Sequence, residues 1–194
     1  MKDKIMTDYL AGFFIFESEN NPTTSPMKKA LLLLSALFFF VSTYAQDNKK
    51  SDIPAVTVKD IDGKPFSTTE IKNEGKPIII DFWATWCKPC VASLNAMSEV
   101  YAQWQTETGV KIYAVSIDDT RTMSSVAPFA AGKGWDFTVL LDANSDLRRA
   151  MSVNNVPHTF LIDGNGKIVL QRNTYSPGDE EKMYEELKKL VAGK

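Results

Sequence analysis

The chain has 194 residues, enough for one domain of ordinary size. Its 22 Lys and Arg residues nearly balance its 24 Asp and Glu residues, so the net charge of −2 gives no basis for binding nucleic acid or anionic lipid. The only histidine, His158, makes a His-based catalytic triad or a multi-histidine metal centre hard to build. We therefore expect no nucleic acid partner, no metal and no other cofactor.

Residues 27–45 have the pattern of a cleaved secretory signal. A methionine at position 27 is followed by two lysines, an apolar run over 30–41 and small residues that end at Ala45. The run is shorter than the roughly 20 residues that a membrane-spanning helix needs. No cysteine lies near Ala45 to carry a lipid anchor. We expect cleavage after Ala45 and a location in the periplasm or cell envelope.

Residues 1–26 precede this signal and fit no targeting pattern, because a signal normally begins at the N-terminus. We interpret them as an upstream extension produced by a misassigned start, with translation beginning at Met27. The mature chain is then residues 46–194, which is the size of one domain.

The first elements of the mature chain are a hairpin, a buried strand and a long helix. A strand over 55–58 and a turn over 60–64 predict the hairpin. The run 77–83 is too continuously apolar for a half-solvated strand and predicts a central strand buried on both faces. After Cys87, apolar residues recur every three or four positions, which predicts a helix that ends at Gly109. These apolar residues are Val91, Leu94, Met97, Tyr101 and Trp104.

The second half continues the alternation of strands and helices. We expect strands over 110–117, 137–141, 159–162 and 167–171, and helices over 122–133 and 146–151. The segment 163–166 reads DGNG and predicts a hairpin turn between the last two strands. A final helix begins near 176–179 and is expected to bury Met183, Leu187, Leu190 and Val191. Right-handed crossovers then give an α/β fold, a mixed central sheet with helices on both faces.

The strongest chemical signal is the pair Cys87 and Cys90, which follows the central strand where the long helix begins. Only the thiolate attacks a disulfide, and a helix N-terminus stabilises that negative charge. Cys90 is one helical turn away and can displace a mixed disulfide, while Pro89 fits the first turn, where its missing N–H costs nothing. We therefore predict that Cys87 is the nucleophile, that Cys90 resolves, and that the two form a redox disulfide.

Two simpler interpretations of the pair are weaker. The pair could be half of a zinc site, but a structural zinc site takes four protein ligands and this chain offers two cysteines and one distant histidine. A purely structural disulfide would close a very short loop and add little stability.

Asp81, in an otherwise apolar strand six residues before Cys87, is predicted to have a raised pKa and to relay a proton. The alternative for Asp81 is pairing with a lysine or exposure at the strand end.

The segment 81–90, DFWATWCKPC, resembles the active-site segment of thioredoxins, which place an aspartate where Asp81 stands. Residues 156–163, VPHTFLID, resemble their cis-proline loop and the strand that follows. The extra helix and strand over about 120–141, the N-terminal hairpin and the signal are similar to the periplasmic TlpA/ResA-like branch. This resemblance covers about residues 52–191 and implies a thioredoxin-like three-layer fold with an N-terminal β-hairpin and an extra αβ insertion.

The resemblance also implies a cis bond between Val156 and Pro157, which adds Pro157 to the catalytic residues. A free backbone edge at Val156 would pair with an extended substrate. Trp86, Lys88 and Pro89 complete the residues that we expect to contact substrate. Trp86 is expected at the rim and Trp83 in the core, and plain packing is the alternative role for both. His158 follows Pro157 and could tune the Cys87 thiolate or simply be solvated, and we expect it to be solvated.

One position departs from the TlpA/ResA-like branch. That branch often carries a glutamate three residues after the second cysteine, where this chain has Ser93. The acid at Asp81 is instead placed as in thioredoxin proper, so the branch's role in cytochrome c maturation is not carried over to this chain.

The sequence as a whole predicts an exported thiol-disulfide oxidoreductase that exchanges disulfides with protein substrates. We expect a monomeric reductant that is recharged by a membrane electron donor. One alternative is a peroxiredoxin-like thiol peroxidase, whose reactive cysteine needs a threonine-and-proline pocket that Thr85-Trp86-Cys87 does not provide. The other is a non-enzymatic copper-handling module, for which two cysteines and His158 are few ligands.

Overall fold

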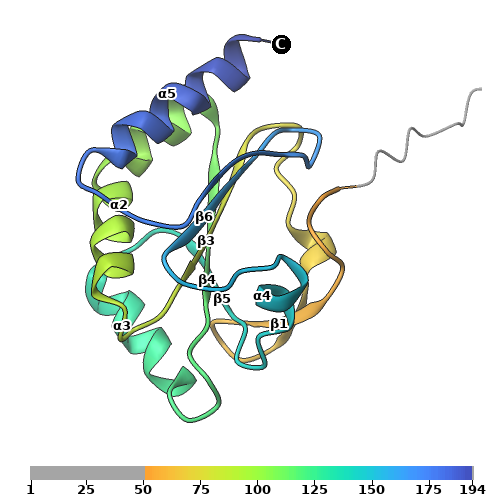
Figure 1. Cartoon of the computed structure of the whole chain (residues 1–194), viewed down its shortest axis with the longest axis vertical. Helices are drawn as coiled ribbons and strands as arrows, with labels where there is room; N and C mark the ends of the chain where they lie inside the picture. The colour runs from red at the N-terminus through yellow and green to blue at the C-terminus, as the bar shows by residue number, and fades with distance from the viewer. Residues whose placement is uncertain (1–50, 194) are drawn as a thin grey trace, which may run out of the picture. The chain divides into compact units, whose positions relative to one another are not determined.

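A seven-stranded mixed sheet organises the fold (Figure 1). This computed structural model describes residues 51–193, so the predicted extension 1–26 and signal 27–45 lie outside the described residues. The elements in chain order are β1 Thr57–Asp60, β2 Pro65–Ser67, the 3₁₀ helix η2 Thr68–Glu70, β3 Ile78–Trp83, α2 Lys88–Thr108, β4 Lys111–Ser116, the 3₁₀ helix η3 Met123–Ser125, α3 Val126–Lys133, β5 Thr138–Leu141, α4 Asp146–Ala150, β6 His158–Ile162, β7 Ile168–Arg172 and α5 Asp179–Ala192.

The strand order is β2-β1-β5-β4-β3-β6-β7. Strands β3, β4 and β5 run parallel, whereas β6, β7 and the β1–β2 hairpin pair in antiparallel fashion. Helices α2, α3 and α5 cover one face of the sheet and α4 lies on the other (Figure 1). The expected thioredoxin-like three-layer architecture is therefore confirmed, with its N-terminal hairpin and the additional α3–β5 unit.

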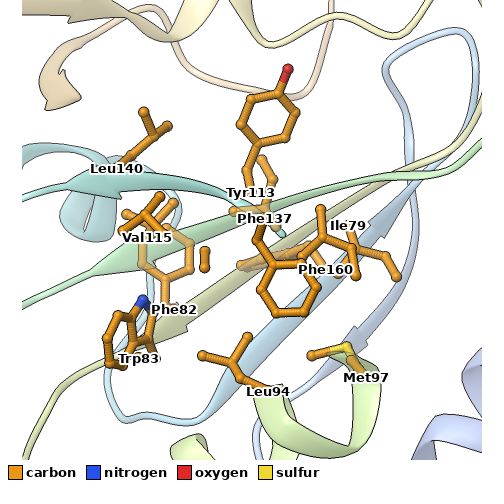
Figure 2. Packing of buried hydrophobic residues seen from close by; sticks show 14 of the residues in the cluster. Ile79, Phe82, Trp83, Leu94, Met97, Tyr113, Val115, Phe137, Leu140 and Phe160 are labelled. Atoms are coloured by element: carbon orange, nitrogen blue, oxygen red, sulfur yellow. The ribbon is translucent and has the colours of Figure 1, made fainter. Parts of the chain in front are cut away.

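The central strand β3 is buried at all six positions, as its continuous apolar run predicts. It lies between β4 and β6 in the middle of the sheet, with buried side chains on both of its faces. Figure 2 shows the two resulting layers of core, with Leu94 and Met97 of α2 on one side of the sheet and Tyr113 and Leu140 on the other. This rigid strand leads directly into the cysteine motif.

Most of the boundaries that differ from the sequence prediction do so by one residue, and two larger differences have identifiable reasons. Strand β1 begins at Thr57 because the Val56 N–H donates to the hydroxyl of Thr68 at 2.9 Å and not to a strand partner. The helix expected over 122–133 starts with the 3₁₀ turn η3, and α3 begins at Val126. Pro128 lacks an N–H and is tolerated only in the first turn of an α-helix, which places the α-helical start just before it.

Candidate active site

The cysteine pair lies at the junction of β3 and α2. Cys87 is the N-cap of the helix, Pro89 lies in its first turn, and Gly109 ends it with φ 67°. Cys87 and Cys90 form a disulfide with their Cα atoms 5.3 Å apart. The Cys90 N–H donates to Cys87 Sγ at 3.3 Å, in the place where a serine oxygen would cap a helix. The same N–H and the helix dipole would stabilise a thiolate on Cys87 in the reduced protein.

Exposure distinguishes the two cysteines. Cys87 is 6% exposed to solvent, whereas Cys90 is fully buried. Trp86 beside Cys87 is 63% exposed, and Lys88 and Pro89 are exposed as well. The reactive sulfur expected to meet a substrate is therefore the one that solvent reaches, and an exposed aromatic side chain lies next to it.

The Val156–Pro157 bond is cis, as the resemblance implied. Strand β6 pairs with β3 so that His158 stands opposite Phe82. The proline loop that precedes His158 therefore lies at the same end of the sheet as the β3–α2 junction. Val156 is half-buried and Pro157 is buried. The roles of these two residues in catalysis and substrate binding stay predictions.

Asp81 is fully buried in β3 and has one hydrogen-bonding partner among residues 51–193. The Thr159 hydroxyl donates to its Oδ2 at 2.6 Å, while Oδ1 has no partner in this part of the chain. Burial raises the pKa of Asp81 to about 7, and the Thr159 hydrogen bond acts in the opposite direction. Asp81 is thus neither solvated nor paired with a lysine, and its pKa suits proton exchange near neutrality.

The expectation that His158 is solvated is wrong. Its side chain is buried, stacks on the Phe160 ring with a centroid distance of 4.7 Å, and places Nε2 2.8 Å from the Gln171 amide nitrogen. Burial lowers the pKa of His158, which favours the neutral ring. The prediction failed because His158 belongs to a strand and not to the exposed part of the proline loop. It is the first residue of β6, and the neighbouring strands β3 and β7 shield it from water.

Asp118, which the sequence analysis did not identify, ties the active-site loop to the end of β4. Its carboxylate is 1% exposed and accepts from the Thr85 N–H at 2.9 Å, the Thr85 hydroxyl at 2.6 Å and the Ser116 hydroxyl at 2.8 Å. Thr85 lies two residues before Cys87. An acid directly after a buried strand, at the edge where α/β sheets place their sites, was the signal that could have revealed it.

Replacing Asp118 with alanine is expected to lower the free energy of unfolding by about 2 to 3 kcal/mol, because three donors lose a charged acceptor in a buried place. Chemical denaturation of the oxidised protein measures this loss. Replacing Asp136, which is exposed, with alanine is the matched control and should cost much less. Equal effects of the two substitutions would contradict the anchoring role of Asp118.

Residues 51–193 offer neither of two other kinds of site. Across residues 51–193, the His, Cys, Asp and Glu side chains form no group of three or more that could hold a metal ion. In the same range, no helix is long and apolar enough to cross a membrane.

The fold and the paired cysteines at the start of α2 define a thioredoxin-like thiol-disulfide oxidoreductase. The chain belongs to the AhpC/TSA family, whose sequence pattern matches residues 50–171.

Individual relatives agree with this class. The thiol-disulfide oxidoreductase ResA of Geobacillus thermodenitrificans is 34% identical over 143 residues, which are 71% of this chain and 79% of ResA. ResA of Bacillus subtilis is 31% identical over 144 residues, 72% of this chain and 78% of its own length. The solution structure of an uncharacterized thioredoxin-like protein from Porphyromonas gingivalis is 48% identical with a TM-score of 0.66, and the match covers 75% of this chain and 95% of that one.

Proposed function

We propose that this oxidoreductase is an exported reductant of protein disulfides, with Cys87 as nucleophile. The observation that carries the proposal is the position of Cys87. It caps α2, it is the more exposed member of the pair, and the exposed Trp86 lies beside it. A helix N-terminus lowers the pKa of a thiol, and an exposed aromatic ring offers an apolar contact to a partner protein.

The exchange takes place in two steps. The Cys87 thiolate attacks a substrate disulfide, which forms a mixed disulfide and releases one substrate thiolate. Asp81 then accepts the proton of the Cys90 thiol, and the Cys90 sulfur attacks Cys87 Sγ. The second substrate thiolate leaves and is protonated, so two electrons have moved to the substrate and the Cys87–Cys90 disulfide remains. A membrane dithiol protein would return two electrons and two protons.

Substrate contacts in this proposal come from residues around the cysteines. Trp86, Lys88 and Pro89 would contact the segment that carries the target disulfide, and the Val156 backbone would pair with it as an added strand. Pro157 would position that backbone. Export is supported by the signal pattern over 27–45 in the sequence, and it would place the reaction in the periplasm or cell envelope.

The test is to express the full chain with Cys90→Ser and to separate envelope proteins without a reducing agent. The Cys90→Ser protein can form the mixed disulfide but cannot resolve it. We therefore expect covalent adducts in the envelope fraction that a reducing agent cleaves. Cys87→Ser is the matched control, since it also lacks the internal disulfide but has no nucleophile, and it should show none. Equal adducts in both variants would refute the assignment of Cys87, and adducts confined to the cytoplasm would refute export.

A further inference from the structure

Thr159 connects the buried carboxyl group of Asp81 with a small cavity. Strands β3 and β6 pair so that Thr159 stands directly opposite Asp81, and the hydroxyl donates to Oδ2 at 2.6 Å. Paired residues of an antiparallel ladder project to the same face. Both side chains therefore lie on one face of the sheet. This hydrogen bond fixes one oxygen of an acid that has no other hydrogen-bonding partner among residues 51–193.

The cavity lies on the α2–α5 side of the sheet, where these two helices pack together (Figure 1). Its volume is about 20 Å³, which is room for about one water molecule. Besides Thr159, its walls include Ser93 and Met97 of α2, Met183 of α5, and Tyr175 and Glu180 near the start of α5. Thr159 thus lies between Asp81 on one side and a partly polar cavity on the other.

A threonine hydroxyl at this place can transmit a proton. It has one donor hydrogen and two acceptor lone pairs, so it can donate to Asp81 while it accepts from a water molecule in the cavity. When Asp81 is protonated the directions reverse, and the hydroxyl donates towards the cavity. The acid can exchange its proton with solvent in this way without leaving the core.

We propose that Thr159 is a positioning residue that holds Asp81 and links it to the α2–α5 cavity, and that it thereby sets the pH range in which the cysteine pair exchanges. The inference rests on the proposed function, in which Asp81 takes the proton of Cys90. It adds a residue and a route for the proton that the sequence motif does not contain.

The other groups around this route are few. On the α2 side the cavity wall holds the neutral Ser93, while the two cysteines stand at the start of that helix. On β6 the buried His158 precedes Thr159 in sequence. At the outer wall of the cavity, Arg172 lies 3.5 Å from Asp179, and the Tyr175 hydroxyl donates to Glu180 at 3.5 Å. These outer groups are paired with each other. Among residues 51–193, the Thr159 hydroxyl is therefore the one hydrogen-bonding contact that stabilises ionised Asp81.

The experiment compares Thr159→Val, which keeps the shape and removes the hydroxyl, with Thr159→Ser, which keeps the hydroxyl. Thr138→Val, at an exposed strand position, is the matched control. In the oxidised protein, the titration of Asp81 is followed by carbon NMR of its carboxyl group. Removing a hydrogen bond to a buried charge should raise the Asp81 midpoint by about one pH unit or more in Thr159→Val, with the wild-type midpoint retained in Thr159→Ser and Thr138→Val.

The pH profile of insulin disulfide reduction is the second measurement. The rise of the rate with pH should move upwards in Thr159→Val by the same amount as the Asp81 midpoint. An unchanged midpoint and profile in Thr159→Val would overturn the inference. Because the titration is measured without turnover, it stands apart from the proposed function, which fails only if the cysteine variants do not behave as expected.

Discussion

Insulin disulfide reduction by the Cys87→Ser protein is expected to fall to the rate of the small-molecule reductant alone. Cys87 is the N-cap of α2 and the more exposed cysteine of the pair, so no other sulfur in the site can begin the exchange. A serine hydroxyl is not ionised near neutral pH and does not attack a disulfide. The measurement is the turbidity of precipitating insulin B chain with dithiothreitol as the electron source.

Cys90→Ser is the control that separates chemistry from folding. Both variants lose the disulfide, so a loss of stability common to them cannot explain a difference between them. Cys90→Ser should still react once with a disulfide probe and then stop, whereas Cys87→Ser should not react at all. Retained turnover in Cys87→Ser would remove Cys87 from the nucleophilic role.

Replacing Asp81 with asparagine is expected to stabilise the oxidised protein in a pH-dependent way. The folded pKa is raised from its ordinary value of 3.8 to about 7, because the carboxyl is buried. The contribution of protonated Asp81 to the free energy of unfolding is fully present below pH 3.8. This contribution is lost as the pH rises through about 7, because the folded protein must then bury a charged carboxylate. The advantage of Asp81→Asn should grow by roughly 4 kcal/mol between pH 4 and pH 8.

Chemical denaturation at a series of pH values measures this difference. Asp62→Asn, at an exposed turn position, is the control and should change little with pH. A constant offset between wild type and Asp81→Asn across the whole pH range would show that the buried acid does not titrate near neutrality. In that case Asp81 would not be suited to receive the proton of Cys90.

The sequence predicted the elements that carry strong local patterns. The structure has a strand at the Ile78–Ile80 run and a helix where apolar residues recur after Cys87. It also has a hairpin at the turn over 163–166. Local pattern was also sufficient for the N-cap position of Cys87, because Pro89 and Gly109 mark the two ends of the helix. The cis bond at Pro157 was accessible only through resemblance, since most X-Pro bonds in folded proteins are trans.

Residues that act through long-range pairing could not be predicted in the same way. Thr159 gains its importance from the β3–β6 register, which places it opposite Asp81 across 78 positions of sequence. Asp118 reaches Thr85 only after β3 and β4 have paired. The burial of His158 likewise depends on strand β7, which returns along the edge of β6. Each of these facts follows from the sheet as a whole and not from a local motif.

Because the four indole rings are unevenly buried, the intrinsic tryptophan fluorescence of the protein can report binding near Cys87. Trp83, Trp104 and Trp135 are 0%, 2% and 9% exposed, whereas Trp86 is 63% exposed and adjoins Cys87. A water-soluble fluorescence quencher such as iodide therefore reaches one indole ring of four, and that ring lies on the surface where we propose that substrates dock. Any partner that covers this surface shields the ring, so complex formation changes the quenchable fraction of the intrinsic emission without an added label.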